Sequence, residues 1–156
     1  MSVFNLSPVT GQSLNFEAVL NALNSSLPTA YAATMTGNDY ATSSATFSDL
    51  IAITEDVEAD EIVVLIGTVN FSGSVVADKV EFQITADGTR VGKTSTQRID
   101  AVDTTGKANS AAFVVVSDAS LSGSIDFALE WRRETGSGTL YTEDETLIII
   151  RLKKRA

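Results

Sequence analysis

Carboxylates are the main candidates for chemistry in this chain. The 156 residues include 20 Asp and Glu against 11 Lys and Arg, and the chain has neither cysteine nor histidine. These absences exclude disulfides, thiolate catalysis and Cys-based metal sites, and they remove the commonest general base and transition-metal ligand. Catalysis by carboxylates alone remains open, and we expect no cofactor.

The best-placed carboxylates are Asp126 and Glu130, which we expect on one face of a strand. At a rise of about 3.3 Å per residue they lie about 13 Å apart, and the carboxyl pairs of glycosidases are only about 5–9.5 Å apart. Glu130 can instead form a surface ion pair with Arg132 or Arg133, which is worth under about 1 kcal/mol. We interpret this face as solvated and the chain as not an enzyme.

An acidic run at residues 55–61 holds five carboxylates in seven residues. Hard cations such as Ca²⁺ take oxygen ligands from loops of this kind, but the run lacks the glycine and the ligand spacing of an EF-hand loop. A solvated turn is the alternative. Trp131 has two interpretations as well: a sugar-stacking platform with the tyrosines, or a core residue in register with Phe127 and Leu129.

Charge and hydropathy bear on the partners of the chain. A net charge of −9 argues against nucleic acid, whose binding depends on Lys and Arg contacts to phosphate. No apolar run approaches the roughly 20 residues of a membrane helix, and the N-terminus lacks the features of a secretory signal. We therefore expect no nucleic acid, no membrane, and synthesis in a cytoplasm. Basic residues gather only at the C-terminus, in residues 151–155.

Residues 13–27 form the one segment with helical spacing. Ser13 or Asn15 can cap the predicted helix, and Pro28 ends it. Its apolar residues are Leu14, Phe16, Val19, Leu20, Leu23 and Leu27. Two interpretations stay open, because this apolar stripe can pack on the rest of the domain or dock on a partner.

The clearest β-hairpin spans residues 80–93, where apolar and polar residues alternate around Asp87-Gly88. These two residues suit a type I′ turn, and a two-residue loop places Ile84 opposite Val91. About eight strands follow residue 46 without βαβ alternation, so the sequence predicts an all-β, jelly-roll-like β-sandwich. We divide the chain into an N-terminal arm, helix and linker at 1–45 and the β-domain at 46–156. Residues 29–45 are a linker or an irregular first strand.

Three predicted strands are apolar on both faces: residues 62–66, 111–116 and 147–152. A strand in a two-sheet sandwich should be apolar on one face only. Long loops can cover the second face of one such strand, whereas three favour a partner subunit. The residues that we expect to contact partners are Leu14, Phe16, Leu20, Leu23, Ile148, Ile150 and Leu152.

The predicted strands, in their order along the chain, resemble those of a known group of proteins. The segments TFSDLIAIT, IVVLIGTVNFSGS, VEFQITADGTRVGKT and SIDFALEWRRETGSGTLYTEDETLIIIRL resemble small jelly-roll virion proteins of tailed phages, namely head decoration (cement) proteins, head fibres and TNF-like trimeric modules. The resemblance spans residues 46–152 and implies a non-enzymatic homotrimer that binds the major capsid protein on the capsid surface of the virion. A carbohydrate- or receptor-binding module of a phage fibre is the alternative. The matching residues set the fold, so no functional residue is transferred.

Overall fold

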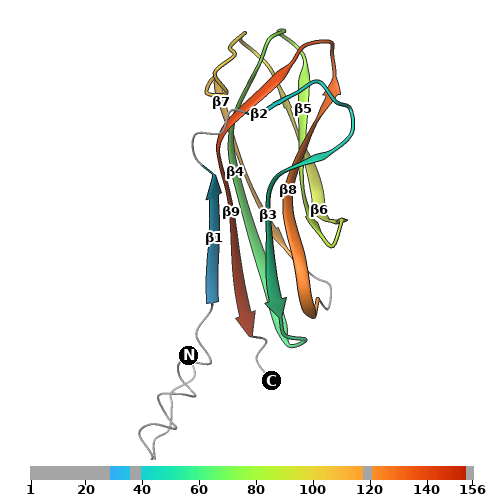
Figure 1. The fold of residues 1–156 in the computed structure, drawn as a ribbon, viewed down its shortest axis with the longest axis vertical. Helices are drawn as coiled ribbons and strands as arrows, with labels where there is room; N and C mark the ends of the chain where they lie inside the picture. The colour runs from blue at the N-terminus through green and yellow to red at the C-terminus, as the bar shows by residue number, and fades with distance from the viewer. Residues whose placement is uncertain (1–28, 36–39, 118–120, 154–156) are drawn as a thin grey trace, which may run out of the picture.

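The computed structural model describes residues 29–35, 40–117 and 121–153. These residues form an all-β sandwich of two antiparallel sheets, which confirms the all-β class and the two-sheet sandwich that the sequence predicts (Figure 1). The strands are β1 (Thr29–Met35), β2 (Tyr40–Thr42), β3 (Ser48–Val57), β4 (Glu61–Gly73), β5 (Lys79–Ala86), β6 (Thr89–Arg98), β7 (Asn109–Val116), β8 (Gly123–Thr135) and β9 (Leu140–Lys153). The helix predicted at residues 13–27 lies outside the described residues.

The two sheets differ in strand order. Sheet A has the order β1-β9-β4-β7, with β2 also paired to β9, and sheet B has the order β3-β8-β5-β6. Strands that are consecutive in the chain usually lie in different sheets. This holds for β3 and β4, β4 and β5, β6 and β7, β7 and β8, and β8 and β9. The chain therefore crosses repeatedly between the layers, and residues from both sheets face one core.

The predicted hairpin is present as β5 and β6. Ile84 lies opposite Val91, as the two-residue loop requires. Asp87 has φ 47° and Gly88 has φ 71°, the positive values that a type I′ turn needs at both central positions. The register between these strands is therefore the one that we expected from the sequence.

Residues 29–45 contribute two strands to sheet A. β1 pairs with β9 from Thr29 opposite Arg151 to Met35 opposite Glu145, and β2 pairs with β9 at residues 140–142. We gave two interpretations of this segment, a linker or an irregular first strand. The structure has strands at 29–35 and 40–42. The physical reason is the length of β9, whose backbone groups need partners along both edges. The described strands number nine: β1 and β2 precede residue 46, and seven follow it, against about eight expected there.

The core lies between the sheets and is built from alternate residues of each strand. Trp131 is 2% exposed, which confirms its assignment to the core. Phe82 stacks on Phe113 with ring centroids 6.0 Å apart. The ring of Phe113 lies over Gly67, where any Cβ would collide with it, so the glycine allows this close approach.

Candidate interaction surfaces

The outer face of sheet A carries apolar side chains in three paired strands. Leu152 lies opposite Ile62 at one end of the sheet, and the next rows join β9, β4 and β7. We call this surface the apolar face; its residues are Ile62, Val64, Ile66, Val114, Val116, Ile148, Ile150 and Leu152. Val114 is 63% exposed and Val116 is 57% exposed. A surface of this kind marks an interaction site more often than a solvated one.

Strand geometry explains why these side chains point outward. Side chains alternate between the faces of a strand, so Val63 and Leu65 enter the core while their neighbours cannot. The next row of the sheet, Thr68 opposite Thr146, is polar. The apolar face therefore occupies the half of sheet A that contains the C-terminal end of β9.

Three of the predicted contact residues, Ile148, Ile150 and Leu152, belong to the apolar face. Whether they contact a partner stays a prediction. Leu14, Phe16, Leu20 and Leu23 lie outside the described residues. Sequence reasoning missed the members from β4 and β7 as individual residues. The sequence contains these residues in the runs that are apolar on both faces. Only the register between the paired strands shows which of them face outward together.

The outer face of sheet B is polar, unlike that of sheet A. Arg132 Nη2 lies 2.6 Å from Glu81 Oε2, and its guanidinium sits 4.4 Å from the centre of the Phe47 ring. Arg133 Nη1 donates to the carbonyl oxygen of Gly138 at 2.7 Å. Among the described residues these arginines therefore bind groups other than Glu130, and the ion pair that we considered for Glu130 is wrong. Arg132 forms its ion pair with Glu81, which lies opposite it on β5.

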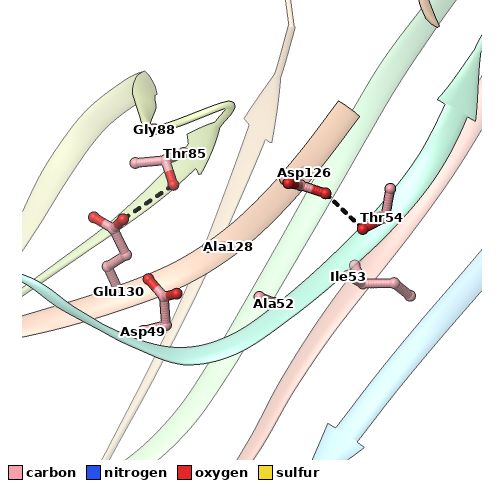
Figure 2. Close-up of a pocket in the computed structure, with 9 residues that line it drawn as sticks. All are labelled: Asp49, Ala52, Ile53, Thr54, Thr85, Gly88, Asp126, Ala128 and Glu130. Carbon is pink, nitrogen blue, oxygen red and sulfur yellow. Dashed lines mark hydrogen bonds between the residues drawn. The ribbon is translucent and has the colours of Figure 1, made fainter. Parts of the chain in front are cut away.

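A shallow groove of about 310 Å³ crosses sheet B at β3, β8 and β5 (Figure 2). Thr54 Oγ1 donates to Asp126 Oδ1 at 2.5 Å, and Thr85 Oγ1 donates to Glu130 Oε1 at 3.3 Å. The amide of Gln83 donates to the other oxygen of Glu130 at 2.5 Å. Asp126 and Glu130 thus line one surface, each held by a neutral donor from the neighbouring strand. The arrangement is that of a hydrogen-bonded polar sheet face rather than an acid–base pair.

Within the acidic turn at residues 55–61, the carboxylate of Glu61 makes contacts inside the fold. Glu61 Oε2 accepts from the backbone N–H of Glu58 at 2.9 Å and lies 3.7 Å from Arg151 Nη1. Arg151 also donates to the carbonyl oxygen of Asp56. In the described ranges no group of three or more acidic residues is arranged to hold a metal ion. These contacts favour a structural turn over the calcium interpretation.

One buried carboxylate has an unusual environment. Glu145 is fully buried, and neither of its carboxylate oxygens has a hydrogen-bond partner among the described residues. Burial raises the pKa of Glu145. The nearby hydroxyl of Thr142 and the backbone of Glu145 lower this pKa, the charges of Asp144 and Glu143 raise it, and burial is the largest of these effects. Glu145 lies on the inner face of β9, away from the groove on sheet B, and so belongs to no candidate catalytic arrangement.

Comparisons with known proteins give a weak likeness to solved structures. No protein-family model matches the chain, and no curated protein matches it. A crystal structure of the infectious bursal disease virus VP2 subviral particle is similar over 83% of this chain and 38% of the other, with TM-score 0.44 and 19% identity. A structure of the infectious bursal disease virus Gx strain gives TM-score 0.41 and 14% identity over 83% and 37%. The chain thus spans under two fifths of those chains, and TM-scores this low carry no argument about function.

In the ranges that the structure covers, no helix has the length and apolarity that a membrane crossing requires.

Proposed function

We propose that this chain is a structural virion protein, a non-enzymatic homotrimer that binds the major capsid protein and decorates the outside of a phage head. The apolar face of sheet A is the observation that carries the proposal. Val114 and Val116 are more than half exposed on it, and burial of apolar surface contributes about 25 cal/mol per Å². A protein that presents such a face gains stability when another protein surface covers it.

The strand order supports the same proposal at the level of the fold. We assign the sandwich to the jelly rolls, because β1-β9-β4-β7 and β3-β8-β5-β6 with crossing connections form two Greek keys. This assignment agrees with the resemblance to decoration proteins. Fold alone does not determine function, so the apolar face remains the principal support.

The alternative is a carbohydrate- or receptor-binding module of a phage fibre, and it has less support. Trp131, the strongest candidate for stacking on a sugar, is buried in the core. The groove on sheet B offers carboxylates that Thr54, Gln83 and Thr85 already occupy. A sugar would have to displace these hydrogen bonds without gaining an aromatic platform.

Co-sedimentation with purified capsids tests the proposal. We expect the protein to sediment with capsids and to raise their melting temperature, because a ligand that binds only the assembled state stabilises it by mass action. A protein that leaves capsids unchanged and gives a glycan-array signal would instead favour the fibre module. Light scattering on the free protein tests the homotrimer separately.

A further inference from the structure

We infer that residues 13–27 of each subunit cover the apolar face of sheet A on a neighbouring subunit, so that exchanged N-terminal segments hold the oligomer together. The inference rests on the proposed self-association, and it identifies the two surfaces that contact each other in the oligomer. One surface is described by the structure, and the other is the segment with the helical apolar pattern. The predicted contact residues on the two segments would then touch each other.

The position where the segment joins the sheet supports this occupant. Thr29 lies opposite Arg151, and β1 runs antiparallel to β9. The chain that precedes β1 therefore leaves sheet A beside the C-terminal end of β9, as the start of β1 and the end of β9 show in Figure 1. The apolar face begins at the same end, where Leu152 lies opposite Ile62.

The size of the apolar face decides between a helix and a second sandwich. With strands about 4.8 Å apart and a rise of about 3.3 Å per residue, the face measures roughly 15 by 18 Å. A standard subunit interface buries about 800 Å² on each partner, so the apolar face alone could form only the core of one. A helix is about 10 Å wide, and a helix that ends before Leu27 rises about 18 Å from Leu14 to Ser26. One helix of this length fits the face.

The chemistry of the two surfaces also matches. The apolar face holds no charged side chain, and the only charged residue between positions 13 and 27 is Glu17. The outer face of sheet B carries Glu81, Arg132 and the groove carboxylates Asp126 and Glu130, which form hydrogen bonds or ion pairs, together with the carboxylate of Asp49. An apolar helix face would bury those charges at a cost, so sheet A is the surface that suits it.

The length of the link favours a neighbouring subunit over the same one. Only Pro28 separates Leu27 from Thr29, the first residue of β1. Proline keeps the residue before it extended, and a connection that reverses direction usually takes about 2–6 residues. The segment therefore continues beyond the end of its own sheet, and short hinges of this kind favour exchange between copies.

Cysteine cross-linking tests the exchange, and the chain suits it because it has no cysteine of its own. The double variant Leu23→Cys/Ile150→Cys, treated with a short bis-maleimide, should give covalent dimers and trimers on a denaturing gel. The matched control Leu23→Cys/Thr54→Cys carries its second cysteine on the outer face of sheet B and should stay monomeric on the gel. Val64→Cys replaces Ile150→Cys if circular dichroism shows that the first variant is unfolded.

A mixture of two single-cysteine variants distinguishes a contact between subunits from a contact within one chain. A mixture of Leu23→Cys and Ile150→Cys proteins should give a heterodimer, since exchange brings the two cysteines together only between copies. A cross-link within one chain would overturn the exchange, because the segment would then cover its own sheet. An oligomer by light scattering without any cross-link would also overturn it and leave the proposed self-association standing. A monomer at micromolar concentration would overturn both.

Discussion

At the scale of single residues, the buried Glu145 gives the sharpest prediction. Its carboxylate has no hydrogen-bond partner in the described part of the chain, and its pKa lies above the ordinary 4.5. The folded state therefore favours the protonated form. The stability that this proton contributes is full below the unfolded pKa and is lost as the pH rises through the folded pKa.

We predict that Glu145→Gln makes the protein more stable than wild type at pH 7, because the amide fills the same buried site without the charge that the carboxylate carries. The advantage should shrink as the pH falls towards 4.5, because wild-type Glu145 then gains its proton. Urea unfolding at several pH values measures the difference in stability between the two proteins and its dependence on pH. The control is Asp60→Asn, which changes an exposed residue and should stay within about 0.5 kcal/mol of wild type. An advantage that does not depend on pH would contradict this account.

The residues in the core and in the turn were the most predictable from sequence. Trp131 was placed in the core by its alternation with Phe127 and Leu129, and the Asp87-Gly88 turn set the register of its hairpin. These predictions succeeded because each depended on local pattern alone. The burial of Glu145 was not predictable in this way, because it follows from which face of β9 turns inward.

At the scale of elements, β9 shows where the sequence was ambiguous. One set of alternate residues, Ile148, Ile150 and Leu152, is apolar throughout, and the other set includes Glu145 and Arg151 with the apolar Leu147 and Ile149. The structure turns the second set inward. Arg151 is accommodated at the end of the sandwich by Glu61 and the carbonyl oxygen of Asp56. Periodicity cannot choose between two apolar sets, because the choice depends on pairing with β4 and on these distant contacts.

The turn between β8 and β9 gives a prediction at the same scale. Gly138 N–H donates to the buried carboxylate of Asp78 at 2.6 Å, and Gly136 has φ 110° with its missing Cβ directed at the same carboxylate. We predict that Gly136→Ala destabilises the fold by about 2–3 kcal/mol, from backbone strain together with the collision.

The control for this prediction is Gly123→Ala. Gly123 has φ 93° but open space around its missing Cβ. It should therefore show only the backbone cost of about 1 kcal/mol. Thermal unfolding of both variants measures the difference. Equal losses would mean that the contact with Asp78 does not constrain the turn.

At the scale of the whole molecule, the two outer faces differ in their role. We predict that Ile150→Asp or Leu152→Asp dissociates the oligomer or unfolds it, because a charge on the apolar face would be buried without a partner. Asp126→Asn, on the outer face of sheet B, should leave the oligomer unchanged. Light scattering at micromolar concentration measures both. An oligomer that tolerates Ile150→Asp would exclude the apolar face from the contact.

The two ends of the chain lead to different predictions about attachment. We predict that deletion of residues 1–27 abolishes attachment to the capsid and leaves the β-domain folded, because the described strands pair without that segment. Co-sedimentation measures attachment, and circular dichroism checks the fold. Full binding by the truncated protein would show that attachment does not depend on the N-terminal segment.

Removal of residues 153–156 should have a milder effect, since it takes away basic residues and no part of the apolar face. Arg151, which remains, already holds Glu61 within its own chain. The residues beyond it belong to a chain of net charge −9 and are attracted to acidic surfaces of a neighbour. Such attraction is screened over about 8 Å at physiological salt, whereas apolar docking is not. We therefore predict that the shortened protein still attaches, but more slowly and with a weaker dependence on salt. Loss of all binding at low salt would instead make the basic tail the principal contact.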